Sequence, residues 1–457
     1  MKSTAIILCF ILTISGPVVG QEQLSLSQAI QSGLARNYDI QIESKNFDIA
    51  RNNNNWGEAG RWPQLNLNLA QNNSLTDNIQ TATPFQIQDR LVANSLVPSV
   101  TLDWTLFNGF KVQMSKQRLE QLQRETEGNA SIVISNTIQS IILGYYTAVL
   151  QKRRLDEFQK QMDLSQDRYN YLVLKKELGG ASTADLLLEE GNYLTDSTNY
   201  INQQLTYRSS LRSLNLLLAE DDPDKDYNFP DSVTFEPINY RFDDLVAKMN
   251  SDNVDLKKQY LTQSIVKYDL QISKVERYPR LNFSSGFSNT RTRLDLSEAS
   301  FSNQQPDGSL IPIPGPPDPL NSETSLYYGN FTIAFTLFNG GKIKRAIQNA
   351  IVREDIENVR TDRLKLSLYK DLSEAYDSYN IRRQLYGINR RKREVADLNL
   401  QISQEKFRNG TINSFDFRTV QNRRLIAAVQ ELQSIYNLLD TNVSLMRLTG
   451  GIIEEYK

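Results

Sequence analysis

The chain has 457 residues, with 51 Lys and Arg against 53 Asp and Glu, and this near balance argues against a dedicated nucleic-acid binder. It has no histidine and a single cysteine, Cys9, so disulfides, Cys or His nucleophiles and most zinc sites are excluded from an exported mature chain. No Gly-rich phosphate loop or Ser nucleophile motif occurs either, so we expect no enzyme activity, no cofactor and no metal site.

The N-terminus has the pattern of a secretory signal peptide. A positive charge precedes an apolar stretch from Ala5 to Ile14, and Val18 and Gly20 occupy the −3 and −1 positions before Gln21. We therefore expect residues 1–20 to be removed on export. No later stretch reaches about 18 uninterrupted apolar residues. A mature chain that sits in a membrane would then have to be a β-barrel, because only helices and closed barrels satisfy their backbone in lipid.

Two halves of the chain repeat one another. Asn37 recurs as Asn253 within related four-residue motifs, Pro63 recurs as Pro279, and the sequence TLFNG occurs twice, ending at Gly109 and at Gly340. The spacing between the copies changes once, between the Pro and the TLFNG motif, where the second copy carries a proline-rich insertion. An insertion that leaves both flanks in register belongs in an exposed loop tip.

The repeats divide the chain into four parts. We expect the signal peptide at 1–20, repeat 1 at 21–219, an irregular linker at 220–239, and repeat 2 at 240–457. The proline-rich part of the insertion, near 306–319, is expected to form an extracellular loop.

Between the Pro and TLFNG motifs, each copy contains two stretches in which apolar and polar residues alternate. A period of two over about 10 residues is typical of strands with lipid on one face and water on the other. A half-buried sheet in a soluble sandwich is the alternative. The apolar positions are Leu65, Leu67 and Leu69, then Val100, Leu102, Trp104 and Leu106 in copy one, with Leu281, Phe283, Phe331, Ile333, Phe335 and Leu337 in copy two.

Each strand pair is followed by a long helical pattern. Helix formers dominate from Lys111 to Leu178 and from Lys342 to Asn409, and apolar residues recur every seven positions, with a break at Glu157 in the first stretch. About 68 residues would form a rod of roughly 100 Å. Gly179 and Gly410 are natural C-caps, and each is followed by a candidate N-cap for a returning helix. These caps are Thr183 in copy one and Asn413 or Ser414 in copy two.

Four strands cannot close a barrel, and an open sheet edge is not tolerated in lipid. If the strands lie in a membrane, the chain must oligomerise. Three chains would supply twelve strands, which is within the usual range for membrane barrels.

Taken in order, these features resemble the TolC family of outer-membrane efflux proteins, from Leu24 to about Gly450. The resemblance implies an α+β fold: a transmembrane β-barrel closed by three protomers with four strands each, continuous with a long α-helical barrel through the periplasm. It also implies location in the outer membrane. The expected function is a passive exit duct for efflux or type I secretion, supplied by an inner-membrane pump through a periplasmic adaptor protein.

The resemblance further implies roles for the two turns that follow the long helices. In the family these tips close the tunnel and dock the adaptor. The expected docking residues are Gly179, Gly180, Gly410 and Thr411.

The expected periplasmic gate comprises Asp416, Phe407 and Asp185. Asp416 matches the position whose carboxylates ring the entrance, although an ordinary acidic residue near a helix N-terminus is the alternative. Asp185 is its counterpart in the first repeat and is expected to tether the tips. Two family positions differ here, because Phe407 stands where a gate tyrosine is common and Ile412 where an arginine can occur. We therefore expect Phe407 to supply apolar constriction and Asp416 to supply charge.

A periplasmic coiled-coil scaffold is the alternative function. Its weakness is the pair of alternating hairpins, which a scaffold does not need. Two smaller features have open interpretations. Trp62 and Trp104 are candidates for an interfacial aromatic belt, and the basic run from Arg390 to Arg393 is expected to be a solvated helix face.

Overall fold

The structure is a computed structural model that describes residues 22–82, 85–231, 236–297, 300–304, 306–314 and 316–456. The expected signal peptide lies outside these residues. The chain divides into two compact units, and each draws on both sequence repeats. The helical unit contains Met1–Lys45, Gly128–Lys258 and Asp362–Lys457, and the strand unit contains Asn46–Glu127 and Gln259–Thr361.

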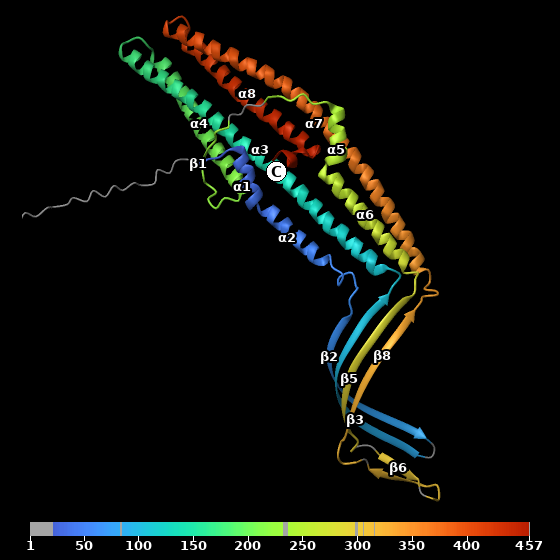
Figure 1. The fold of residues 1–457 in the computed structure, drawn as a ribbon. Coiled ribbons are helices and arrows are strands. Elements are labelled where there is room, and N and C mark those ends of the chain that lie inside the picture. Colours follow the sequence, from blue (N-terminus) through green and yellow to red (C-terminus); the bar gives the residue numbers. More distant parts are fainter. Residues whose placement is uncertain are drawn as a thin grey trace, which may run out of the picture. The chain divides into compact units, whose positions relative to one another are not determined.

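The strand unit is built on one four-stranded antiparallel sheet, with β2 and β8 at its edges (Figure 1). The strands run side by side in the order β2 (Gln64–Ala82), β3 (Phe85–Phe107), β5 (Arg280–Asp295) and β8 (Leu320–Ala334). Each repeat thus contributes one hairpin, and β3 pairs with β5 to join the two.

Cross-strand neighbours in this sheet separate onto one apolar and one polar face. Phe283 lies 4.7 Å from Phe331 between ring centroids, and Phe287 lies 4.8 Å from Tyr327. The opposite face carries mostly Asn, Ser and Thr. The apolar face has the cross-strand rows Leu67–Val100–Phe287–Tyr327 and Trp104–Phe283–Phe331, and the polar face has Asn66–Thr101–Gly286–Tyr328 and Asn68–Ser99–Ser288–Leu326. The alternation expected from the sequence therefore follows the pleat of the sheet, except that β8 ends at Ala334, before the expected strand positions Phe335 and Leu337.

The insertion of the second repeat, which we expect to be an extracellular loop, contains regular secondary structure. It forms two short antiparallel strands, β6 (Ser300–Gln304) and β7 (Leu310–Pro314). A two-stranded ribbon has only edge strands, where a proline without an N–H donor is tolerated. The proline content of the insertion is therefore compatible with short strands, and its extracellular location stays a prediction.

Tryptophans gather near the Arg61-Trp62-Pro63 motif. The indole N–H of Trp104 donates a hydrogen bond to the Arg61 carbonyl at 2.9 Å. The Arg61 guanidinium lies 4.8 Å from the ring centroid of Trp56 and 5.6 Å from that of Trp62. The repeat motif thus joins the first strand pair to the end of the preceding helix. The aromatic belt stays a prediction.

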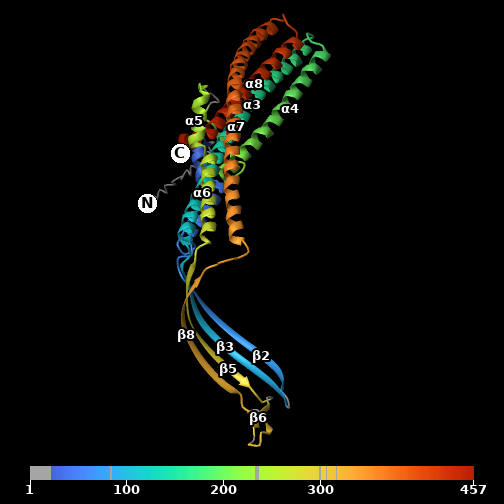
Figure 2. The ribbon, with the colours of Figure 1, turned by 90° about the vertical axis from the view of Figure 1, so that its right-hand side faces the viewer.

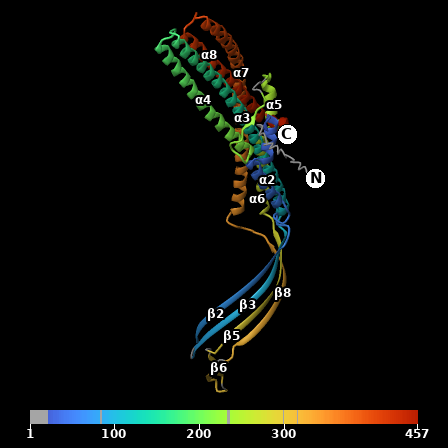
Figure 3. The same cartoon turned by 90° about the vertical axis from the view of Figure 1, so that its left-hand side faces the viewer.

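The helices fall into short and long classes, and two long pairs supply most of the helical unit, although the first parts of α3 and α7 belong to the strand unit (Figures 2 and 3). The long pairs are α3 (Lys111–Glu177) with α4 (Thr183–Leu218), and α7 (Lys342–Arg408) with α8 (Ser414–Leu448). The expected ends of the first helix in each pair are correct to one residue. The shorter elements are β1 (Glu22–Gln23), α1 (Leu26–Arg36), α2 (Tyr38–Asn53), β4 (Tyr227–Asn228), α5 (Phe242–Asp252), α6 (Val254–Val275) and α9 (Gly451–Tyr456).

Each repeat opens with two helices, and the repeated asparagine lies at the break between them. Asn37 follows α1 and Asn253 follows α5, and the side-chain oxygen of each accepts a backbone N–H of the next helix at 2.9 Å. The side-chain amide of Asn37 donates to the Leu217 carbonyl at 3.2 Å, and that of Asn253 donates to the Leu448 carbonyl at 3.0 Å. The two repeats therefore use equivalent contacts to fix the end of each returning helix.

The helical unit has one apolar core for each repeat. The first gathers α3, α4 and α1 around Ile141, Tyr145 and Leu214, and the second gathers α5, α7 and α8 around Leu372 and Leu438. Among the described residues, α3 alone contains a stretch that is long and apolar enough to cross a membrane. Part of α3, between Ile138 and Leu155, supplies buried side chains of the first core.

Candidate functional site at the helical turns

The first turn joins α3 to α4 through Gly179 and Gly180. Gly179 has a φ of +75°, and the N–H of Gly180 donates to the Lys175 carbonyl at 2.8 Å. These contacts satisfy carbonyls that the helix end leaves open. No heavy atom lies within 4 Å of where a Cβ on Gly179 would be, so its positive φ, and not space, favours glycine here.

Ser182, and not the expected Thr183, caps α4. Its hydroxyl accepts the backbone N–H of Asp185 at 3.1 Å and donates to the Asp185 carboxylate at 2.7 Å. The Asp185 carboxylate in turn accepts the Ser182 N–H, which completes a reciprocal capping box. These hydrogen bonds from Ser182 lower the pKa of the exposed Asp185 carboxyl. Thr183 begins the helix one residue later, so the sequence prediction was displaced by a single position.

The second turn has the same backbone design with a weaker cap. Gly410 has a φ of +70°, and the N–H of Thr411 donates to the Lys406 carbonyl at 2.9 Å. Asn413 caps α8 by accepting the Asp416 N–H at 2.8 Å, as one of the two sequence alternatives predicted. The exposed Asp416 carboxylate has no hydrogen bond or ion pair to any other described residue. It is therefore available to a ligand or another chain.

The three expected gate residues are not brought together within one chain. Asp185 and Asp416 lie in the first turns of helices from different pairs (Figure 1). Phe407, near the end of α7, stacks on Phe417 of α8 with ring centroids 4.9 Å apart and planes 9° apart. This ring contact holds the second pair together immediately beside its turn.

A buried ionic seam lies behind the first turn and joins α3, α4 and α8. We use this name for Glu157, Arg168, Glu189, Asp196, Arg418 and Arg424, together with Arg393 and Asp397 of α7. Arg168 pairs with Glu189, which is fully buried, and Arg418 pairs with Asp196 at 2.7 Å. Opposite charges pair throughout, which limits the penalty for taking them out of water.

The far end of the seam centres on Glu157. Its carboxylate contacts Arg424 and lies 3.5 Å from Arg393, and Asp397 contacts both arginines. Burial alone would raise the pKa of Glu157, but Arg424 and Arg393 outweigh it and hold that pKa below its ordinary value. Arg393 is 17% exposed in its side chain, so the expectation of a solvated face is wrong for this member of the basic run.

Sequence reasoning treated Glu157 only as an interruption of the apolar repeat. The interruption was itself the signal, because a charge in the apolar stripe of a packed helix needs a partner. The arginine partners were not evident, because they lie on two other helices, α7 and α8.

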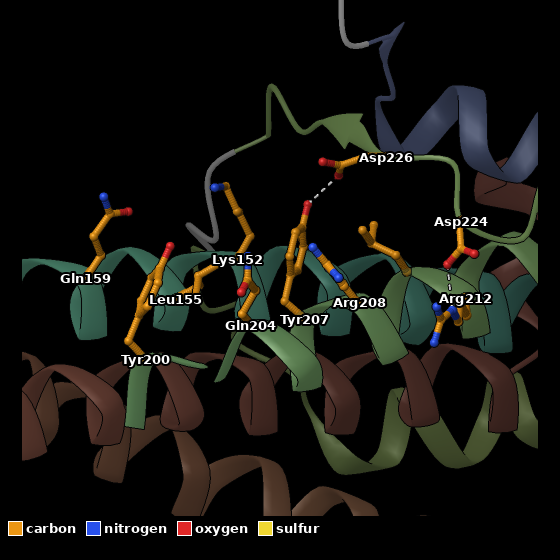
Figure 4. Close-up of a pocket in the computed structure, with 11 residues that line it drawn as sticks. Lys152, Leu155, Gln159, Tyr200, Gln204, Tyr207, Arg208, Arg212, Asp224 and Asp226 are labelled. Carbon is orange, nitrogen blue, oxygen red and sulfur yellow. Dashed lines mark hydrogen bonds and ion pairs between the residues drawn. The ribbon is translucent and has the colours of Figure 1, made fainter. Parts of the chain in front are cut away.

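A polar cavity of about 540 Å³ lies between α3, α4 and the described part of the linker (Figure 4). The Tyr207 hydroxyl donates to Asp226 at 2.8 Å, and Arg212 donates to Asp224 at 2.6 Å. Burial, followed by the hydrogen bond to Asp226, raises the pKa of Tyr207. Because these side chains are mutually paired, the cavity wall anchors the linker to α4. In the described residues, no group of three or more acidic, His or Cys side chains is placed to hold a metal ion.

Residues 245–451 match the family model described as outer membrane efflux protein. This part of the chain is an outer membrane efflux protein domain. Repeat 1, which lies outside this match, has the same order of main strands and long helices and equivalent asparagine contacts. The resemblance to the TolC family is thus confirmed, and the outer membrane is the location of this family. The family consists of channel proteins and not of enzymes.

Three solved channels have the same fold, each over 93% of this chain. CusC matches with 14% identity and a TM-score of 0.71 over 92% of its own length. The Campylobacter jejuni CmeC outer membrane channel matches with 14% identity and a TM-score of 0.69 over 85% of its length. The open state of the Neisseria gonorrhoeae MtrE outer membrane channel matches with 14% identity and a TM-score of 0.65 over 89%. No curated protein sequence matches the chain.

Proposed function

We propose that three copies of this outer membrane efflux protein form a single exit duct, which receives its cargo from an inner-membrane pump through a periplasmic adaptor. The four-stranded sheet carries this proposal, because it has one apolar face and two edge strands, β2 and β8. Its strands have 15 to 23 residues, more than the 9–11 needed to cross a bilayer. Edges in lipid must be paired, so β2 of one copy pairs with β8 of the next.

Two apolar stripes on the helices supply a second surface for the neighbouring copy. On α7, Ile388 and Val395 are 63% and 53% exposed and lie seven residues apart. On α4, Leu194 and Ile201 are 56% and 62% exposed with the same spacing. A seven-residue repeat of apolar side chains is the pattern of a helix that packs against another along its length. Packing the α7 stripe of one copy on the α4 stripe of the next gives a contact that closes into a ring.

The first test is the native mass of the mature chain extracted from the outer membrane. The proposal expects a trimer, with Ile388→Glu reducing it to monomer because a charge enters the apolar contact. Ile388→Leu is the matched control, since it keeps an apolar side chain of similar size in the contact. A monomer in the soluble periplasmic fraction would instead favour the coiled-coil scaffold.

In this duct, Asp416 and Phe407 form the periplasmic entrance. The unpaired Asp416 carboxylates of three copies would gather around one axis, where like charges attract cations. Asp185, in the first turn of α4, would contact the helical turn of the neighbouring copy and tether it. Asp416→Ala should change conductance and remove block by divalent cations, whereas Asp416→Glu should retain both. Unchanged divalent sensitivity in Asp416→Ala would remove the charged ring from the proposal.

The adaptor would dock on the turns that contain Gly179, Gly180, Gly410 and Thr411. These turns are exposed and carry apolar side chains, with Leu178 88% exposed. A Leu178→Asp variant should lose cross-linking to the adaptor while keeping the trimer.

A further inference from the structure

A cavity of about 380 Å³ lies in the strand unit, where β3 ends and α3 begins. Aromatic rings form much of its wall, namely Trp56, Trp104, Phe107 and Phe110. Trp104 also belongs to the apolar face of the sheet, so the cavity adjoins the end of that face. If the sheet spans the membrane as proposed above, this is the level at which lipid headgroups lie and aromatic side chains are favoured.

The cavity wall contains a positive charge and no negative one. Among the described lining residues, Arg61 alone is charged, and its exposed guanidinium forms no ion pair with any described residue. Its contacts with the rings of Trp56 and Trp62 hold it in place but do not neutralise it. The cavity beside the linker differs, because Asp224 and Asp226 accompany the cations there. The charge of Arg61 is therefore available to an anion.

Phe110 has a backbone conformation that glycine favours. Its φ is +69°, and the equivalent residue of the second repeat, Gly341, has a φ of +76°. A bulky side chain in this left-handed region is strained, and such strain is concentrated at functional positions. The Phe110 ring is 57% exposed and lies edge-on to Phe107, with ring centroids 5.5 Å apart. The turn thus keeps an accessible aromatic ring at the cavity, although glycine suits the backbone better.

Repeat 2 retains the cation but not the aromatic wall. Arg277 is equivalent to Arg61, yet it has no cation–π contact with any described ring. Two of the three equivalent wall positions are not aromatic: Ile272 replaces Trp56, Phe335 replaces Trp104 and Gly341 replaces Phe110. The combination of rings and an unpaired cation is therefore specific to repeat 1, and Arg277 provides an internal control.

We propose that this cavity binds the phosphate of a phospholipid whose headgroup has a net negative charge. The phosphate would accept charge-assisted hydrogen bonds from the Arg61 guanidinium, and the glycerol and first methylene groups would pack on Trp104 and Phe110. An anionic headgroup suits the site because no acidic side chain in the wall could pair with an ammonium group. The inference rests on the proposed membrane position of the sheet, but not on the pump, the adaptor or the gate.

The test is native mass spectrometry of the detergent-extracted mature protein, titrated with phosphatidylglycerol or with phosphatidylcholine of the same acyl chains. The protein mass reports the trimer and the lipid adducts report the site, so the two proposals can fail separately. We expect one tight site per copy and about fivefold tighter binding of phosphatidylglycerol, which is the effect of one arginine near an anionic lipid. Equal affinity for the two lipids would overturn the proposal.

Arg61→Gln should abolish the preference for phosphatidylglycerol. The substitution removes the charge but keeps the backbone carbonyl that accepts the Trp104 N–H. Arg277→Gln is the matched control and should retain the preference. Equal lipid binding by the two variants would place the lipid elsewhere. Dissociation of the trimer by Arg61→Gln would instead assign the cavity to a contact between copies, and would also overturn the lipid site.

Phe110→Gly separates a binding role from a structural one. Glycine adopts a positive φ without strain, so the variant should unfold at the same temperature as the wild type or at a higher one. It should nevertheless bind phosphatidylglycerol about threefold more weakly, because the ring no longer covers the lipid. A lower unfolding temperature with unchanged lipid binding would show that the ring serves only the fold.

Discussion

The same three helices pack in two different ways at two places. Between Ile138 and Val149 of α3, the buried contacts with α4 and α8 are mainly apolar and form an apolar seam with Leu211, Leu214 and Val443. Between Glu157 and Arg168 of α3, the contacts with the same two helices form the ionic seam. The seven-residue pattern of α3 alone would have predicted apolar contacts in both places.

The difference matters because the two seams respond differently to change. Apolar packing tolerates shape-conserving replacement and has little dependence on pH or salt. Buried ion pairs give little net stability, yet removing one partner leaves an uncompensated charge. A shift of one helix against another would separate such pairs, so helices joined by buried ion pairs have few other favourable alignments. Every charge in the ionic seam has its partner only when α4 and α8 align in this way behind the turns, whereas the apolar seam contributes buried apolar area.

The largest expected loss of stability follows a substitution at the centre of the ionic seam. Glu189→Ala removes the carboxylate that pairs with Arg168 inside the protein and should cost about 3–5 kcal/mol of stability. The loss should appear as faster amide exchange in peptides around residues 157–170, with the apolar seam still protected. The matched control is Glu190→Ala on the same helix. If Arg168→Met with Glu189→Leu is as unstable as Glu189→Ala, the unpaired charge is not the cause.

Truncating a buried side chain in the apolar seam should cost less stability than removing Glu189. Ile141 is fully buried, and Ile141→Ala should cost about 2–4 kcal/mol through lost contacts and a residual cavity. Unlike Glu189→Ala, this loss should not change with salt concentration. Thermal unfolding of the detergent-solubilised protein at low and high salt measures the difference. A strong salt dependence of the Ile141→Ala loss would erase the distinction between the seams.

The difference between the apolar and ionic seams also explains which features could be predicted from the sequence. The repeats, the long helices, the glycine turns and the alternating strands depend on local pattern, and the structure confirms these elements. The ionic seam depends on residues far apart in sequence, such as Glu157 and Arg424, and local periodicity cannot pair them. Ser182 was missed for a smaller reason, since adjacent Ser and Thr residues are equally good caps and only the backbone angles select one. The roles of Asp416, Phe407 and Asp185 stay predictions because they require neighbouring chains.

Removing the helix cap should destabilise the two turns by different, smaller amounts. Ser182→Ala removes the hydroxyl of a reciprocal capping box, and should cost about 1 kcal/mol or more in the first turn of α4. Asn413→Ala removes a single hydrogen bond to Asp416 and should cost less. Amide exchange at Asp185 and Asp416 reports each turn separately. Equal exchange rates in the two variants would show that the reciprocal bond adds nothing.

The smallest expected effect is acid sensitivity of the ionic seam. The arginines hold the folded-state pKa values of Glu157 and Asp397 below their ordinary values, although burial opposes this. The unfolded chain then binds more protons, so stability is fully present above the unfolded pKa values, near 4. This stability is lost as the pH falls through the lower pKa values that the two carboxyls have in the folded state. Amide exchange around residue 157 should therefore be constant from about pH 7 to 5, after correction for intrinsic rates, and should accelerate below about pH 4.

The matched comparison for this acid effect is Glu157→Gln with Asp397→Asn, against Glu405→Gln in an exposed pair with Arg408. The double variant has no carboxylate left to protonate at this end of the seam, so its exchange should accelerate less in acid than that of the wild type. Glu405→Gln should follow the wild-type curve, because a solvated pair contributes little. A double variant with the full wild-type acid response would show that the sensitivity comes from other carboxylates. The ionic seam would then differ from the apolar seam in its chemistry but not in its response to pH.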